Sequence, residues 1–232
     1  VKKVVKTGAG AALLGDPDRL VDCARAMAAA SGPGRVGVKL RLGPKPPANV
    51  ALDLAGRLAE AGIGWLTLHP RHASQGFSGT ADRTALAAFV AASPVPVLAS
   101  GDLLTAADAV ACLETSKASG VMFARGALAD PRIFHRFTAL RQEVGGRAAP
   151  PLPGLCDVIR RHAALCREHA DETRTLLRMR TAVPRYLRDL PGCRALRDRL
   201  CHCTSWDAFD DIIDAAEALA AKKAAEAQAA AQ

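Results

Sequence analysis

The stretch "PVPVLASGDLLTAADAV", residues 94–110, runs from an apolar segment through three small polar residues into a helix-like pattern. Val95–Ala99 has the composition of a buried strand, and Ser100-Gly101-Asp102 ends it. Apolar residues at helical spacing begin at Thr105. This order predicts one βα unit whose strand ends where the backbone, lacking a Cβ at glycine, can approach another group closely.

Working outward, the same alternation recurs along the first 145 residues. Strands are expected at Val36–Leu42, Trp65–His69, Val95–Ala99 and Gly120–Ala124. Helices are expected to follow them at 47–61, 82–92, 105–114 and from about Pro131 to Val144. Strands about 25–30 residues apart, each followed by a helix, indicate parallel βα units. Their nearly continuous apolar runs are typical of strands covered on both faces. Four such units fit either an open doubly wound sheet or part of a (β/α)8 barrel.

The remainder of the chain shows no strand pattern. Gly145–Pro153 is rich in Gly and Pro, as linkers are. Helices are expected beyond it at 155–170, 173–189, 194–203 and 205–230. We therefore expect an α/β domain at 1–145, a linker at 146–154 and a helical domain at 155–232.

Composition narrows the class of protein. The 232 residues carry a formal net charge of +8, which favours an anionic partner. The seven cysteines have irregular spacings, typical of reduced thiols in a cytoplasmic protein. No apolar run approaches the roughly 18 residues of a membrane span, and the basic start lacks the apolar core of a signal peptide, so no membrane association is expected.

Polar and small residues follow the predicted strands at one edge of the sheet. Lys39 and Arg41 end the first strand, His69 and Arg71 the second, Ser100-Gly101-Asp102 the third, and Arg125-Gly126 the fourth. Ligands bind at the carboxyl ends of parallel strands in both candidate folds. Two successive glycine-containing ends that lead into helices favour a cofactor phosphate over ordinary βα turns.

These segments, in this order, resemble the second half of the flavin-dependent tRNA-dihydrouridine synthases. The resemblance rests on VKKVVKTGAGAALLGDP (1–17), VKLRLG (38–43), LTLHPR (66–71), FSGTAD (77–82), VLASGD (97–102), MFARGAL (122–128) and RTLLRMRTAVPRYLRDLPGCRALRDRL (174–200). It implies the C-terminal half of an FMN-binding (β/α)8 TIM barrel, strands five to eight, followed by an all-α tRNA-binding domain. It also implies that NADPH reduces FMN and that the flavin reduces a tRNA uridine.

The resemblance assigns site residues by motif. Lys39 matches a lysine that contacts the flavin, and His69-Pro70-Arg71 matches a His-Gly-Arg motif with Pro for Gly. Ser100-Gly101-Asp102 matches an Asn-Gly-Asp phosphate motif with Ser for Asn, and Ala124-Arg125 matches a Gly-Arg pair with Ala for Gly. The expected cofactor-binding residues are Lys39, His69, Arg71, Ser100, Gly101, Asp102, Ala124 and Arg125.

Four of these residues carry more specific expectations. Lys39 lies within an apolar strand, so a buried ammonium there requires a partner, either a flavin ring or an acidic side chain. The guanidinium groups of Arg71 and Arg125 suit bidentate binding of a phosphate. Asp102 is expected to cap the helix at Thr105, to hold the ribityl chain, or both.

No catalytic residue is expected in this chain, because the family's catalytic cysteine would precede Val1. Cys23 and Cys112 fall in predicted barrel helices and the other five cysteines in the helical region. The segment Cys201-His202-Cys203 has no spacing typical of a structural metal site, so no metal is expected.

The helical region concentrates positive charge. Between Arg160 and Arg199 it has eleven arginines, no lysine and five acidic residues, a surplus of six positive charges. Such an arginine preference favours nucleic-acid phosphates over an ordinary solvated helix face. The expected RNA-binding residues are Arg174, Arg178, Arg180, Arg185 and Arg188.

The leading interpretation is a flavin-dependent reduction of tRNA uridine to 5,6-dihydrouridine. Two alternatives remain open at the level of sequence. One is another FMN-binding or phosphate-binding barrel oxidoreductase that acts on a small molecule, and the other is a noncatalytic RNA-binding fragment. The residues give no indication of the oligomeric state.

Overall fold

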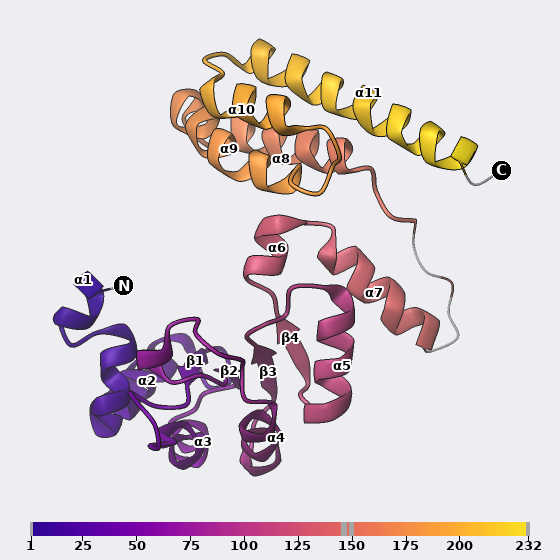
Figure 1. The fold of residues 1–232 in the computed structure, drawn as a ribbon. Coiled ribbons are helices and arrows are strands. Elements are labelled where there is room, and N and C mark those ends of the chain that lie inside the picture. Colours follow the sequence, from indigo (N-terminus) through magenta and orange to yellow (C-terminus); the bar gives the residue numbers. More distant parts are fainter. Residues whose placement is uncertain (1, 145–147, 149–150, 231–232) are drawn as a thin grey trace. The chain divides into compact units, whose positions relative to one another are not determined.

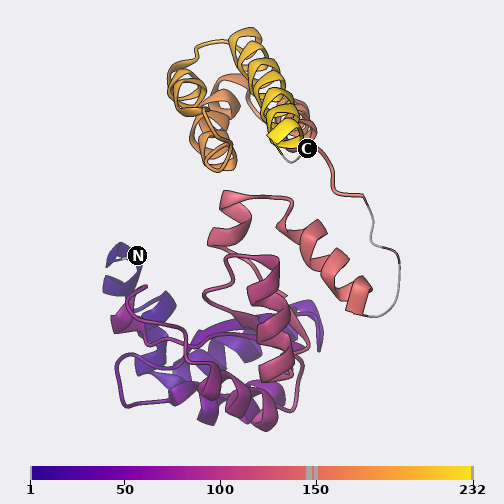
Figure 2. The ribbon, with the colours of Figure 1, turned by 45° about the vertical axis from the view of Figure 1, so that its right-hand side comes forward.

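The computed structural model describes residues 2–144, 148 and 151–230, and the chain divides into two compact units. The first unit comprises residues 1–124 and the second, here called the helical unit, residues 125–232 (Figures 1 and 2). Residues 146, 147, 149 and 150 of the predicted linker lie outside the described residues, and 151–154 have no regular secondary structure.

The first unit is built on a four-stranded parallel sheet. Its strands are β1 (Gly37–Arg41), β2 (Trp65–His69), β3 (Val97–Ser100) and β4 (Gly120–Met122). They lie in the order β1-β2-β3-β4, so each strand pairs with the next one along the chain. This order has no reversal, whereas a doubly wound sheet has one at its switch point. The observed sheet therefore confirms the α/β class and matches a segment of a (β/α)8 barrel.

Helices follow the strands as expected. The helical segments of this unit are α1 (Lys2–Lys6), η1 (Gly10–Gly15), α2 (Pro17–Ser31), α3 (Val50–Glu60), η2 (Ala73–Gln75), α4 (Arg83–Ala92) and α5 (Ala106–Ser116). Four of them, α1, η1, α2 and η2, lie outside the predicted ranges. The sequence analysis assigned no range to α2, although Asp16 caps it by accepting from the Arg19 N–H and Pro17 occupies its first turn.

The strands bury one face of the sheet under the helices. Leu40 of β1, Leu68 of β2 and Ala99 of β3 are in register and fully enclosed, and they belong to one core with Leu54 of α3 and Phe89 of α4. Burying each large apolar side chain of this kind stabilises the unit by about 1.5–3 kcal/mol.

The opposite face of the sheet carries polar side chains. Side chains alternate along a strand, so Lys39, Arg41, Thr67 and His69 share the face away from this core. Lys39 on this face is exposed and Arg41 is half-buried. The polar face thus leads directly to the carboxyl ends of the strands.

The helical unit contains α6 (Arg125–Ala129), α7 (Ile133–Val144), α8 (Leu155–His169), α9 (Glu172–Tyr186), α10 (Arg194–His202) and α11 (Trp206–Ala230). The short α6 before α7 was not predicted. Helices α8 to α11 enclose a core that includes Ile159, Met179, Val183, Phe209 and Ile213. Within the described residues, no helix has the length and apolar character that crossing a membrane requires.

Candidate functional site

The strand ends bring together most of the predicted cofactor-binding residues of the first unit. Arg41 and His69 are paired in register at the ends of β1 and β2, and Ser100 is the last residue of β3. Arg71 and Asp102, two residues beyond β2 and β3, meet through a direct ion pair. The prediction that these strand ends converge is therefore correct for His69, Arg71 and the 100–102 segment.

Arg71 is the most deeply buried charged residue of the site. Its side chain is 2% exposed. Nη1 and Nη2 each donate to one Asp102 carboxylate oxygen at 2.7 Å, which makes a bidentate pair. Nε donates to the Ser78 carbonyl, Nη2 to the Gly79 carbonyl, and Nη1 lies 3.3 Å from His69 Nε2.

These contacts revise the expected role of Arg71. A guanidinium has five N–H donors, and in this structure all five point to protein acceptors. The Arg71 guanidinium therefore has no N–H group left to bind a phosphate. It instead fixes Asp102 and the loop that carries Ser78 and Gly79.

Asp102 does not cap the helix at Thr105, although the sequence analysis expected this role. The cap of α5 is Thr105, whose hydroxyl accepts from the Asp108 N–H while the Asp108 carboxylate accepts from the Thr105 N–H. The Asp102 carboxylate is committed to Arg71 and to the Ala81 N–H at 2.8 Å. Its backbone has a φ of 51°, a left-handed conformation that costs a non-glycine residue about 1–3 kcal/mol.

Gly101 is required at its position for two physical reasons. Its φ of 95° lies in the region that favours glycine. A Cβ at this position would lie 2.5 Å from His69 Cδ2, well inside van der Waals contact. The absence of a side chain at Gly101 therefore lets the β3 end lie directly against the His69 imidazole.

His69 is buried and held in its neutral form. Desolvation, followed by the positive charges of Arg41, Lys39 and Arg71, lowers its pKa from 6.5 to about 4, and Asp102 opposes this only partly. A guanidinium can only donate, so the contact from Arg71 requires His69 Nε2 to accept and places the proton of the neutral ring on Nδ1.

We expect the free energy of unfolding to fall as the pH is lowered from 6.5 to 4. In this window the unfolded chain protonates His69 while the folded chain does not, and above pH 6.5 both forms are neutral. The full difference is on the order of 3 kcal/mol. An NMR titration should find the His69 imidazole neutral at pH 5.5, and His69→Gln should reduce the pH dependence. A His69 pKa near 6.5 would contradict this.

Lys39 and Arg41 supply positive charge at the same strand ends. Contrary to the prediction of a buried ammonium, Lys39 is exposed, and among the described residues it has no ion-pair partner. Partial desolvation and the charge of Arg41 lower the pKa of Lys39. Desolvation and the charge of Arg71 lower the pKa of Arg41. An anion bound at this face would raise both pKa values.

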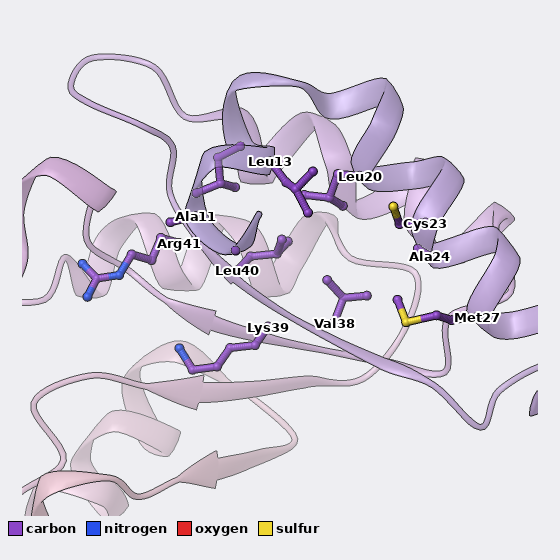
Figure 3. A pocket seen from close by; sticks show the side chains of 12 residues that line it. Ala11, Leu13, Leu20, Cys23, Ala24, Met27, Val38, Lys39, Leu40 and Arg41 are labelled. Carbon is purple, nitrogen blue, oxygen red and sulfur yellow. The ribbon is translucent and has the colours of Figure 1, made fainter. Parts of the chain in front are cut away.

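A cavity of about 350 Å³ borders the outer side of β1 (Figure 3). Apolar side chains from η1 and α2, among them Leu13, Leu20 and Met27, line most of it. Figure 3 shows Lys39 and Arg41 extending away from these apolar side chains. The cavity is therefore mostly apolar, and the Lys39 and Arg41 side chains lie at its edge.

The sequence analysis missed the loop after β2 and its aromatic residue. Arg41 Nη1 donates to the carbonyls of His72 at 3.0 Å and Gly76 at 2.9 Å, so this loop is tied to β1. Phe77 is 63% exposed, with its ring centroid 6.5 Å from that of His69 and 5.9 Å from the Arg41 guanidinium carbon. The aromatic residue in the segment FSGTAD (77–82) was the sequence signal that could have pointed to this loop.

Ala124 and Arg125 lie at the division between the units. Ala124 is the last residue of the first unit, and Arg125 begins α6 in the helical unit. Their participation in a phosphate site beside Gly101 remains a prediction.

Seven arginines of the helical unit form two groups. Arg160 binds Asp214 at 2.6 Å and Glu217 at 2.8 Å, both on α11. Arg167 binds Asp210 at 2.8 Å and lies over the Trp206 ring. Arg180, predicted to bind RNA, donates through Nε and Nη2 to the Cys201 carbonyl near the end of α10. These three side chains hold helices together.

The second group presents an exposed face. Arg174, Arg178 and Arg185 project within about 40° of one another around α9, because they are four and seven residues apart. All three are exposed, as is Arg188 just after the helix, whereas Met179 and Val183 face the core. The predicted cluster therefore exists as a surface, here called the α9 arginine face (Arg174, Arg178, Arg185 and Arg188).

Cysteines occur in both units. Cys23 is on α2 and Cys112 on α5, and the other five are in the helical unit; all seven are free thiols. Burial raises the pKa of Cys112, Cys156 and Cys203. Among the described residues, no group of three or more His, Cys, Asp or Glu side chains could hold a metal ion.

Comparison with known proteins adds a family assignment. The sequence model of the family described as Dihydrouridine synthase (Dus) matches residues 1–226. A "Probable tRNA-dihydrouridine synthase" of Mycobacterium tuberculosis is 36% identical over 92% of this chain and 56% of its own length. A "Probable tRNA-dihydrouridine synthase 1" of Synechocystis sp. is 32% identical over 93% and 60%. The "tRNA-dihydrouridine(16) synthase" of Cupriavidus necator is 39% identical over 60% and 42%. The chain thus spans about half the length of these curated relatives.

Proposed function

The chain belongs to the dihydrouridine synthase family, and on that basis we propose that it takes part in the flavin-dependent reduction of uridine to 5,6-dihydrouridine in tRNA. In this proposal the first unit contributes the phosphate side of an FMN site, and the helical unit contributes a tRNA-binding surface. NADPH is the proposed source of the electrons.

The observation that carries the proposal is the polar face at the strand ends. It combines the exposed Lys39, the half-buried Arg41, a neutral His69 and a glycine-containing turn at 100–102. A small-molecule oxidoreductase could use such a site equally well. The separate α9 arginine face favours an RNA substrate, because a small molecule does not require it.

The residues present fit FMN by the chemistry of their donors. Arg41 and Lys39 have lowered pKa values that an anionic ligand would counteract. When bound, FMN supplies hydride-transfer chemistry. Lys39 would hold positive charge beside the ring, and the backbone N–H groups of the 100–102 turn would hold the phosphate, with Ser100, Asp102 and Ala124 shaping that turn.

His69 and Arg71 would act on the shape of the site. His69 is uncharged at neutral pH, so it can offer one donor and one acceptor without adding positive charge. Arg71 would keep Asp102 and the 78–79 loop in place. The cysteines of the first unit lie on helices α2 and α5, and we assign the proton-donor role of the reaction to no residue of this chain.

A fluorescence titration with FMN and riboflavin tests the cofactor proposal. The two flavins share the ring and differ in the phosphate, so we expect the purified chain to prefer FMN. Equal affinity for both would contradict a phosphate site at the strand ends. Reduction of a small-molecule substrate by the bound flavin, without tRNA binding, would favour the small-molecule alternative.

Arg125→Ala is expected to weaken FMN binding by about 1.5–3 kcal/mol, the usual contribution of a hydrogen bond to a charged group. Riboflavin binding should not change, since the lost contact is to the phosphate. Arg136→Ala, which removes an exposed arginine that binds Asp130 at 3.3 Å, is the control and should leave both affinities unchanged. Unchanged FMN affinity in Arg125→Ala would remove Arg125 from the site.

A further inference from the structure

Arg83 contacts the turn that follows β3 from the side of α4. Arg83 is the first residue of α4, directly after its cap Asp82. Its Nη2 donates to the Gly101 carbonyl at 3.0 Å, and its Nη1 lies 3.1 Å from the Cys112 Sγ on α5. The guanidinium therefore joins two helices to the backbone of the turn.

The turn that Arg83 holds has an unusual conformation. Gly101 and Asp102 have φ values of 95° and 51°, so two successive residues are left-handed. A costly conformation persists only when the surroundings fix it. Arg71 fixes the Asp102 carboxylate, and Arg83 fixes the Gly101 carbonyl.

Holding the Gly101 carbonyl also sets the direction of a donor. In a trans peptide the C=O and the next N–H point in opposite directions. The Gly101 carbonyl points to Arg83, so the Asp102 N–H points away from it. Neither Arg83 nor Cys112 belongs to the set of residues predicted to touch the cofactor.

We propose that Arg83 is a positioning residue, which orients the Gly101–Asp102 peptide so that the turn presents its N–H groups to a flavin phosphate. The inference rests on the proposed function for the identity of the ligand. The conformational part of it does not, because Arg83 makes these contacts with other groups of the protein.

The test compares Arg83→Met with Arg83→Lys, and Arg25→Met serves as the control. Met keeps an unbranched apolar stem and loses every donor, Lys can still reach the Gly101 carbonyl, and Arg25 is an exposed arginine that binds Asp22 on α2. Amide shifts and hydrogen exchange at 101–103 are measured by NMR, and FMN and riboflavin affinities by fluorescence.

In Arg83→Met we expect amide exchange at 101–103 to be at least about tenfold faster. FMN affinity should fall about five- to tenfold with riboflavin affinity unchanged, and Arg83→Lys should restore most of both. A general loss of stability would instead weaken the two flavins equally and would overturn the proposal. So would unchanged amides in Arg83→Met.

The outcomes separate this inference from the proposed function. A wild-type chain that does not prefer FMN over riboflavin contradicts the cofactor site, while the amide comparison still decides whether Arg83 orients the turn. Altered amides with an unchanged FMN-to-riboflavin ratio overturn the link between Arg83 and the phosphate alone.

Discussion

Asp102→Ala is expected to lower the free energy of unfolding by about 3–5 kcal/mol. The substitution leaves the Arg71 guanidinium, 2% exposed, without its counter-charge, and an unpaired buried charge is among the most destabilising changes in a protein. It also removes the acceptor of the Ala81 N–H. Denaturant unfolding followed by circular dichroism measures the change.

An exposed ion pair provides the matched control. Arg57 Nη2 and Asp18 Oδ1 are 2.6 Å apart, as close as the Arg71–Asp102 pair, but both side chains are exposed. Asp18→Ala should therefore cost less than about 1 kcal/mol. The double variant Arg71→Met/Asp102→Ala should cost less than the sum of its single variants, because neither charge is then left alone. A cost for Asp102→Ala no larger than that for Asp18→Ala would contradict the buried-pair interpretation.

The strands were predictable because their apolar runs are short and clearly bounded. The structure has β2 at Trp65–His69, as predicted, and β3 begins two residues later than predicted, at Val97. Pro94 and Pro96 explain the difference, since proline cannot donate to a ladder. The start of α6 at Arg125 was missed because a five-residue helix has too little periodicity to recognise.

The sequence predicted which strand-end residues come together, but it did not predict the hydrogen bonds between them. Parallel strand ends had to bring His69, Arg71 and the 100–102 turn together. The sequence could not predict that all N–H groups of Arg71 are hydrogen-bonded within the protein, because two of their acceptors are the Ser78 and Gly79 carbonyls. Backbone groups of a loop carry no signal in the sequence.

Lys39 illustrates a different limit. Its apolar neighbours Val38 and Leu40 suggested burial, yet strand alternation places them toward the core and Lys39 on the other face. Whether that second face is covered depends on tertiary structure. The pattern of one strand cannot decide it.

Arginines in the helical unit show the same limit for charge. Arg160 and Arg167 counted equally with Arg178 and Arg185 in the surplus of positive charge. The structure pairs the first two with acidic residues of α11, more than forty positions away in sequence. Counting charges along the chain located the basic unit. Only the fold shows which of its arginines are paired with acidic residues of α11 and which are not.

Arg178→Ala/Arg185→Ala is expected to weaken tRNA binding and to flatten its salt dependence. Each arginine that contacts a phosphate contributes about 0.7–0.9 to the slope of log affinity against log salt, so the double variant should lose about 1.5–2 units. Alanine is a good helix former, and both side chains are exposed, so α9 should persist. Gel-shift titrations at four salt concentrations measure the slope.

Arg160→Gln/Arg167→Gln is the matched control, because it removes the same charge from the same unit. These two arginines are already ion-paired with acidic residues of α11, namely Asp210, Asp214 and Glu217, so the slope should change little. A long-range effect of net charge would lower the slope equally in both double variants and would contradict a contact surface on α9. Because folded RNA is recognised largely by shape, the wild-type chain should also prefer tRNA over an unstructured oligonucleotide of equal length. Equal affinity for the two would leave the α9 arginine face as an ordinary solvated surface.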